Sequence, residues 1–206
     1  LEKANPELKK NDSPTQRVGS DLTSDFPEVE HTVPVLSLDK EYTVQGLLAW
    51  VRKVGSEENP EIVIEEKIDG VSIVLYYEEG ILIRAVTRGN GFVGNDVTAN
   101  VRTIPSIPLR LPEKLNIAVR GEIYLPIKSF ETLNEQMNMQ YANPRNLAAG
   151  TLRRIKSSEV AKVPLTMFAY EGYFDPPLER HTEVLKRLRE LGFRINNRTG
   201  VFTQEN

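Results

Sequence analysis

Lys67 stands in a short run of charged residues that could carry out covalent chemistry. It lies between two apolar runs, within the segment 65–70, Glu-Glu-Lys-Ile-Asp-Gly. If this segment is a strand, alternation places Glu65, Lys67 and Asp69 on one face. Three charged groups on one face are costly to bury unless they bind a ligand. An amine flanked by carboxylates is therefore a candidate nucleophile, although Lys-x-Asp-Gly alone equally fits a solvated, salt-bridged surface lysine.

Two later strands can bring further charged groups to this lysine. Thr87-Arg88-Gly89 ends an expected strand over residues 81–88, which forms a hairpin with residues 71–77 through a turn at Gly80. That hairpin delivers Arg88 close to the loop after Lys67. In the expected strand 117–125, alternation places Arg120, Glu122 and Tyr124 on the face opposite Val119 and Ile123.

A third segment, residues 142–153, begins with a helix-start signal: Asn143 as the cap and Pro144 at the first helical position. It carries Arg145 and Arg153, with further basic residues just beyond. This cluster predicts a basic patch suited to contacts with phosphate groups, because an arginine guanidinium donates charge-assisted hydrogen bonds to phosphate oxygens. The alternative is an ordinary solvated helix face. The Gly-rich loop 89–95 lacks the Gly-Lys-Ser/Thr ending of a phosphate-binding loop.

Five segments of this chain, taken together and in order, closely resemble the adenylation domain of the bacterial NAD-dependent DNA ligases. The resemblance covers almost the whole chain, so chance agreement is a poor explanation. The five segments, which accompany the lysine motif, are Asp12–Gly19, His31–Asp39, Thr87–Gly91, Val119–Leu125 and Ala142–Arg153.

The resemblance implies a role for each matching residue. Lys67 matches the nucleophile that attacks the α-phosphate of NAD, expels nicotinamide mononucleotide and retains AMP. In the family, the AMP then passes to the 5′-phosphate of nicked double-stranded DNA, and the 3′-hydroxyl displaces it to seal the nick. Glu65 matches the residue that reads adenine, and Tyr170 is similar to the aromatic residue that stacks on it. The other matching positions are Ser37 and Leu38 in the adenosine pocket, Arg88 and Glu122 at the ribose and phosphate, Asp69 and Gly70 in the lysine motif, and Arg145 and Arg153 at DNA or the mononucleotide phosphate.

Elementary chemistry constrains these roles. Only a neutral amine attacks phosphorus, and carboxylates near an amine favour its charged form instead. Asp69 and Glu122 therefore need another task, such as hydrogen bonding to ribose hydroxyls or holding Mg²⁺ through water. Two other interpretations stay open: Arg88 could simply pair with Glu65 across a hairpin, and Tyr170, in an apolar strand, could pack in the core.

Composition is that of an ordinary globular protein, with 206 residues, 39% hydrophobic and 27% charged. The absence of cysteine excludes disulfides and thiolate chemistry, and His31 and His181 lack metal-ligand spacing, so no metal site is expected from side-chain ligands. The net charge of −3 argues against coating nucleic acid by bulk electrostatics. We see no apolar run of the roughly 20 residues that a membrane helix needs and no signal peptide. A cytoplasmic protein is the default expectation.

The predicted fold is α+β, built on antiparallel sheets with packed helices, as in the nucleotidyltransferase (ATP-grasp-like) adenylation domains. Residues 1–40, broken by prolines, are expected to form an extended leading segment, and residues 41–206 the N-terminal part of the adenylation domain. Strands are expected over 61–68, 71–77, 81–88, 117–125, 165–170 and 193–195; helices are expected after Thr43, from Ser129 through Met137, after Asn143 and over 183–191, ending at Gly192.

The chain also departs from the family pattern. Family members carry two further lysine motifs in this domain, and nothing after Glu122 has that form. We expect a fragment, incomplete at its C-terminal end, with little or no nick sealing by itself; any Zn²⁺ would belong to the absent C-terminal part of the parent. No obligate protein partner is implied. The alternatives are a non-catalytic nucleotide-binding module and an ATP-dependent ligase or capping-type nucleotidyltransferase.

Overall fold

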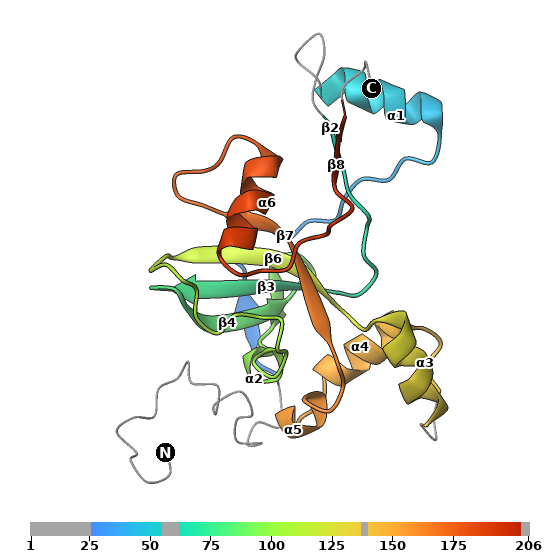
Figure 1. Ribbon diagram of the computed structural model, residues 1–206, viewed down its shortest axis with the longest axis vertical. Helices are drawn as coiled ribbons and strands as arrows, with labels where there is room; N and C mark the ends of the chain where they lie inside the picture. The colour runs from blue at the N-terminus through green and yellow to red at the C-terminus, as the bar shows by residue number, and fades with distance from the viewer. Residues whose placement is uncertain (1–25, 55–61, 137–139, 203–206) are drawn as a thin grey trace.

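Four antiparallel strands form the main sheet, in the order β4–β3–β6–β7 (Figure 1). The computed structural model describes residues 26–54, 62–136 and 140–202. Along β6 buried and half-buried residues alternate, as expected where one face of a strand packs on the core. The mixture of antiparallel strands and helices confirms the predicted α+β class. The strands are β3 (Val71–Glu78), β4 (Ile81–Thr87), β6 (Ile117–Tyr124) and β7 (Thr166–Tyr173).

The main hydrophobic core lies on the face of this sheet that α6 (His181–Glu190) covers. Ile73 and Leu75 of β3 are completely buried there, and Leu188 of α6 is equally buried. The helix is amphipathic, so its apolar side rests on β7 while its charged side faces solvent. This packing fixes α6, and with it the position of His181 at its first turn.

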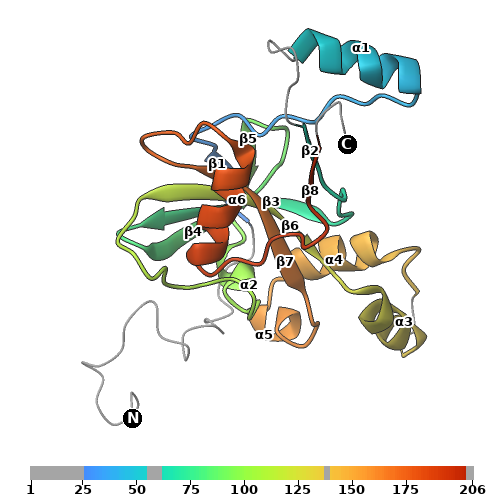
Figure 2. The same ribbon diagram turned by 45° about the horizontal axis from the view of Figure 1, so that its top comes forward.

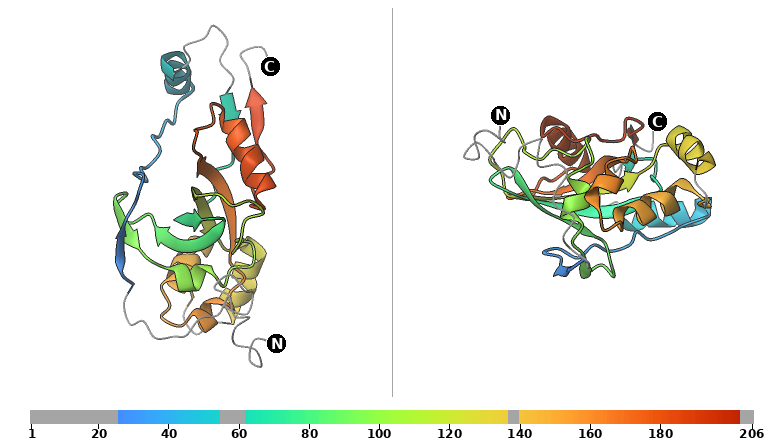
Figure 3. Two further views of the ribbon diagram at one scale, coloured as in Figure 1. Left: turned by 90° about the vertical axis from the view of Figure 1, so that its left-hand side faces the viewer. Right: turned by 90° about the horizontal axis from the view of Figure 1, so that it is seen from below.

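A segment that we call the strap, residues 26–38, covers the opposite face of the sheet. Figure 3 shows β1 (Glu28–Glu30), within the strap, and α6 on opposite sides of the sheet. β1 pairs with β5 (Val93–Asn95), and the backbone N–H of Val35 donates to the carbonyl of Gly91 at 2.8 Å. Val35 is only 2% exposed. The strap is therefore held by both backbone pairing and apolar burial.

The strap is also tied to the sheet by His31. Its Nδ1 lies 3.0 Å from the Tyr76 hydroxyl, and its Nε2 lies 3.1 Å from the carbonyl oxygen of Thr87. A carbonyl only accepts, so Nε2 carries the hydrogen and donates it. Because Thr87 immediately precedes Arg88, this bond anchors the end of β4 where Arg88 leaves the sheet.

Two of the remaining helices begin at the capping residues expected from the sequence. The side chain of Thr43 accepts from the Gly46 N–H at 3.0 Å, and that of Asn143 accepts from the Asn146 N–H at 2.8 Å, so both predicted N-caps are confirmed. Gly192 ends α6 with φ of +92°. The helices are α1 (Val44–Val54), α2 (Thr98–Val101), α3 (Ile127–Glu135), α4 (Pro144–Leu152) and α5 (Ser157–Val160).

Helix α1 stands away from the main sheet (Figures 1 and 2). Its apolar side chains are not covered by the described part of the chain: Leu47, Leu48 and Trp50 are each about half exposed. A separate two-stranded pair, β2 (Ile62–Ile64) with β8 (Gly200–Phe202), leads into the lysine motif.

Several expected boundaries are wrong. The strand expected over 61–68 is limited to Ile62–Ile64, because β8 pairs with these three residues alone, so Glu65, Lys67 and Asp69 do not share a strand face. Residues 193–195 form no strand; the Arg194 carbonyl accepts one backbone bond, from Ala169. The leading segment was not expected to contain a regular element, but Glu28–Glu30 pairs as β1.

Two helix predictions and one strand prediction need smaller changes. Helix α3 begins at Ile127 and α6 at His181, and the last strand of the sheet runs from Thr166 to Tyr173. The Gly80 turn has the predicted positive φ, +74°. The expected segment Asp12–Gly19 and the helix positions Gly55 and Met137 lie outside the described residues.

Replacing Leu188 with alanine tests the packing of α6. Because Leu188 is fully buried in the core, Leu188→Ala is expected to lower the free energy of unfolding by about 2–5 kcal/mol. The exposed Lys186 on the same helix provides the control, and Lys186→Ala is expected to stay within about 0.5 kcal/mol of the parent. Urea denaturation measures both. A Leu188→Ala loss below about 1 kcal/mol would contradict the packing described here.

Candidate functional site

A cavity of about 630 Å³ lies on the strap side of the main sheet, where β3, β6 and β7 meet the lysine motif. It gathers side chains that are far apart in the sequence, so only the folded chain brings them together. Ten of the eleven site residues expected from the sequence line it: Ser37, Leu38, Glu65, Lys67, Gly70, Arg88, Glu122, Arg145, Arg153 and Tyr170. Asp69 does not line the cavity, but it contacts Arg145 at its edge.

The lysine motif is held against β6 at Gly70. Its N–H donates to Glu122 Oε1 at 3.2 Å, and a Cβ built at this position would lie 2.2 Å from the carbonyl oxygen of Ile123. Only glycine permits this close approach, and this explains why the last residue of the lysine motif is glycine. The segment that contains Lys67 has no regular secondary structure, and its contact at Gly70 places it beside the Glu122 side chain.

Glu122 is a partly buried acidic group of the cavity. It pairs with Ser72 across β3 and with Phe168 across β7, so it stands in the middle of the sheet and faces the cavity. Burial raises the pKa of its carboxyl above the ordinary value, while the positive charge of Lys67 and the Gly70 N–H oppose that rise. The carboxylate therefore relies on these two neighbours for compensation.

The strap closes one side of the cavity through Ser37 and Leu38. Arg88 Nη1 donates to Ser37 Oγ at 3.3 Å, and the Arg88 backbone N–H donates to the Ser72 carbonyl at 3.2 Å. The expected alternative, in which Arg88 pairs with Glu65, is not the contact formed. Arg88 instead joins the strap to the end of the hairpin.

Tyr170 is directed at the cavity by a β-bulge. Arg120 pairs with Glu171 while Gly121 pairs with Ala169, which leaves Tyr170 as the extra residue of β7. Its hydroxyl lies 3.2 Å from Ser72 Oγ, and its ring lies 5.6 Å from the guanidinium of Arg120. Burial raises the pKa of the Tyr170 hydroxyl. The side chain lines the cavity and is partly buried, and its stacking on adenine stays a prediction.

Arg120 connects several of these parts, a role that the sequence did not indicate. Its Nη2 donates to the Leu36 carbonyl of the strap at 2.8 Å, and its Nη1 lies 3.4 Å from Glu171 Oε2. Its alternation with Glu122 was predicted correctly, which places both side chains in the cavity lining. Arg120 therefore fixes the strap just before Ser37.

Arg145 and Arg153 approach the cavity from the two ends of α4. Arg145 follows the Pro144 start, and its Nη1 lies 3.0 Å from Asp69 Oδ1; both side chains are more than half exposed. Arg153 is the C-terminal cap of the helix. The opposite side of α4 is buried through Leu147 and Leu152. The two arginines thus share a cavity wall despite their angular offset on an ideal helix.

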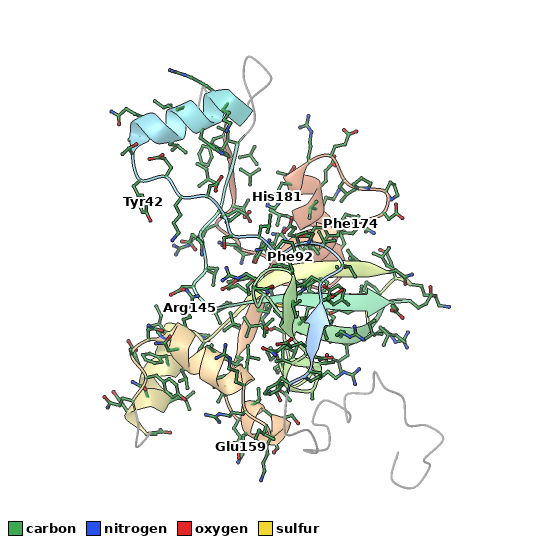
Figure 4. All side chains as sticks on the ribbon, turned by 180° about the vertical axis from the view of Figure 1, so that it is seen from behind. Tyr42, Phe92, Arg145, Glu159, Phe174 and His181 are labelled. Atoms are coloured by element: carbon green, nitrogen blue, oxygen red, sulfur yellow. The ribbon has the colours of Figure 1, made fainter. Side chains whose placement is uncertain are left out.

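His181 is the principal site residue that sequence reasoning missed. Its Nε2 lies 2.7 Å from Glu65 Oε2, and both side chains line the cavity. In Figure 4 His181 stands at the start of α6 and Arg145 at the start of α4, so the two approach the site from different elements. No spacing signal could reveal the pair, because the two residues are 116 positions apart.

A second, smaller cavity of about 380 Å³ lies farther along the same face, between β1 and the outer ends of β3 and β6. Its lining includes Tyr76, Arg84 and Tyr173, and among the described residues it contains no lysine. The nucleophile and its charged neighbours belong to the larger cavity, which we take as the candidate site.

Within the described ranges, no group of three or more His, Cys, Asp or Glu side chains is arranged to hold a metal ion. A metal at this site would need ligands from water or a bound phosphate. In the same part of the chain, no helix has the length and apolar character needed to cross a membrane.

Comparison with known proteins identifies the family. Residues 23–206 match the model of the NAD-dependent DNA ligase adenylation domain. The chain belongs to this family. The chain is 48% identical to the DNA ligase of Borreliella afzelii (strain PKo) over 207 positions, and 49% identical to that of Borreliella burgdorferi (strain ZS7) over 208 positions; each match covers 100% of the chain. It is 48% identical to the DNA ligase of Borrelia hermsii (strain HS1 / DAH) over 202 positions, 95% of the chain.

The adenylation-domain chain spans less than a third of these relatives: 31% of each Borreliella ligase and 30% of the Borrelia hermsii ligase. The resemblance noted from the five sequence segments is thereby confirmed. In the sequence, the two histidines lack metal-ligand spacing. In the structure, His31 anchors the strap and His181 contacts Glu65.

The variant Glu122→Gln tests the electrostatics of the site through stability. Because the folded-state pKa of Glu122 is raised above the ordinary 4.5, its favourable contribution is complete below that ordinary value. The contribution is lost as the pH rises through the folded pKa. Glutamine does not titrate and still offers an oxygen to the Gly70 N–H.

We therefore expect Glu122→Gln to gain on the parent as the pH rises from 4 to 7, ending roughly 0–1 kcal/mol more stable. Thermal melts of both proteins across this range provide the measurement, and Glu131→Gln, at an exposed position of α3, is the control. An equal loss of stability at every pH would instead assign Glu122 a purely structural role.

Proposed function

We propose that this adenylation domain catalyses the AMP-transfer chemistry of an NAD-dependent DNA ligase acting on nicked double-stranded DNA, in replication and repair. The observation that carries the proposal is the presence of Lys67, Arg88 and Glu122 in the lining of one cavity, in a chain of this family. We assign residues 1–40 to a leading segment and residues 41–206 to the N-terminal part of the catalytic unit, acting in the cytoplasm.

In the first step, the neutral Nζ of Lys67 attacks the α-phosphorus of NAD. The bond from that phosphorus to the bridging oxygen breaks, nicotinamide mononucleotide leaves with the electron pair, and AMP remains on Lys67 as a phosphoramidate. The attacking nitrogen then releases one of its two hydrogens as a proton to water, which leaves the phosphoramidate N–H. Arg88 offers positive charge where negative charge develops on the phosphate oxygens. An interaction that is stronger in the transition state than in the ground state lowers the reaction barrier.

The adenosine part of the ligand is assigned to the remaining lining residues. Glu65 accepts from the exocyclic amine of adenine, and Tyr170 stacks on the base with the free part of its ring. Ser37 and Leu38 cover the nucleoside from the strap side. Glu122 accepts a hydrogen bond from a ribose hydroxyl, a role supported by its position beside Gly70 in the cavity lining.

Mg²⁺ fits this site only with help from non-protein ligands. The negative charge of Asp69 acts on Glu122, so a hydrated ion bound near them would interact with both carboxylates through water. Mg²⁺ in proteins usually keeps several waters and binds one or two carboxylates together with substrate phosphates. When bound, the ion would supply charge neutralisation at the phosphates.

In the later steps, AMP passes from Lys67 to the DNA 5′-phosphate, and the 3′-hydroxyl then displaces it. Arg145 and Arg153 are the proposed phosphate contacts, since both are cationic, line the cavity and extend from α4 toward solvent.

Intact-mass measurement tests the nucleophile. We expect the chain, incubated with NAD and Mg²⁺, to gain the mass of one AMP, and we expect no gain for Lys67→Ala or for Lys67→Arg, which keeps the charge but is not nucleophilic. ATP in place of NAD is expected to give no adduct. An adduct that persists in Lys67→Ala would contradict the assignment, and an adduct formed with ATP alone would refute NAD use.

DNA binding at several salt concentrations tests the two arginines. Each phosphate contact adds about 0.9 to the negative slope of log K against log salt, so Arg145→Ala with Arg153→Ala should reduce that slope by about 1.8. Lys186→Ala, at an exposed position of α6, is the control and should leave the slope unchanged. An unchanged slope in the double variant would identify an ordinary solvated helix face.

A further inference from the structure

We propose that His181 is a positioning residue for Glu65, and that this contact sets the preference of the cavity for adenine over a purine with an oxo group at position 6. The inference rests on the proposed function, because it presumes that Glu65 meets the base. It adds a residue from a distant helix to the recognition of the nucleotide.

The contact has the geometry of a strong hydrogen bond. His181 Nε2 lies 2.7 Å from Glu65 Oε2, at the short end of the range for a bond with a charged acceptor. An ionised carboxylate only accepts, so Nε2 carries the hydrogen and donates it. The Glu65 side chain is 25% exposed and that of His181 37% exposed, so the pair is partly shielded from water.

Glu65 depends on this partner because its own segment supplies little support. β2 ends at Ile64, and Glu65 itself lies outside any regular element. The other nearby donor, Thr199 Oγ1, lies 3.4 Å from Glu65 Oε1 and only 3.0 Å from the carbonyl of Asn196. A hydroxyl has a single hydrogen, and the shorter bond to the carbonyl uses it. His181 is therefore the firm constraint on the carboxylate.

His181, in contrast, stands on a fixed support. It is the first residue of α6, and the helix is anchored by Leu185 and Leu188 in the main core. A helix N-terminus also favours a nearby negative charge. The carboxylate of Glu65 is thus connected through α6 to the main hydrophobic core on one side, while its remaining lone pairs can accept from a ligand in the cavity.

This arrangement discriminates by hydrogen-bond polarity. The amine of adenine donates, whereas the oxo group of hypoxanthine only accepts and would face a fixed acceptor. A site built around a positioned polar partner rejects an analogue that cannot make the bond far better than a site of matching shape alone. Without His181, the carboxylate can turn away, so the preference falls.

The test compares the binding of two dinucleotides to the purified 206-residue chain by isothermal titration, without Mg²⁺. The probes are NAD and nicotinamide hypoxanthine dinucleotide, which differ at position 6 of the purine. For the parent we expect a preference for NAD of about tenfold or more. His181→Ala is expected to weaken NAD binding about tenfold while changing binding of the hypoxanthine dinucleotide by less than about twofold.

Two variants separate positioning from structure. His181→Gln keeps an N–H donor at similar reach and is expected to retain most of the preference, and Lys186→Ala, also on α6, should retain all of it. In a Glu65→Gln background, His181→Ala is expected to have no further effect on the preference, because it acts through Glu65. Equal weakening for both dinucleotides, or additive effects in the double variant, would overturn the inference. A parent that binds neither dinucleotide would instead contradict the proposed function.

Discussion

The register between β3 and β6 is the constraint on which the whole site depends. Ser72 faces Glu122 across this pair, and the lysine motif ends two residues earlier, at Gly70, whose N–H donates to Glu122. Because side chains alternate, a slip of one residue would turn Glu122 into the core and bring Ile123 to the cavity. The buried apolar set on β6 opposes any such slip. Core packing therefore fixes the distance between the lysine motif and its acidic partner.

The second requirement is a cover for the polar face of the sheet. Polar groups such as Arg120 and Tyr76 are costly to leave partly buried without partners, and the strap supplies them as backbone carbonyl and imidazole contacts. In turn, these bonds hold Ser37 beside the cavity. The same interactions thus provide partners for Arg120 Nη2 and the Tyr76 hydroxyl and shape the ligand site, so stability and binding geometry are coupled through the strap.

Much of this could be predicted from the sequence, because the strands alternate strongly and the helix caps use ordinary signals. The residues that gather around Lys67 were also identifiable, since each belongs to a distinctive local segment. The bulge that redirects Tyr170 could not be predicted, because it arises from pairing between β6 and β7 rather than from any turn residue. The contact between Glu65 and His181 was hidden for a similar reason: a lone histidine beside a helix start resembles any other capping residue.

The charge distribution explains how an acidic chain can present a site for anionic ligands. The net charge of −3 is spread over the surface, and at about 0.1 M salt charges are screened beyond roughly 10 Å. A phosphate near the cavity therefore responds to the groups that line it rather than to the total. Arg88, Arg145 and Arg153 all line that cavity, and the carboxylate of Asp69 already contacts Arg145. An incoming phosphate would compete with Asp69 for Arg145, so binding there must be accompanied by release of this surface ion pair. An exposed pair of this kind contributes less than about 1 kcal/mol, which makes the exchange readily available to a ligand.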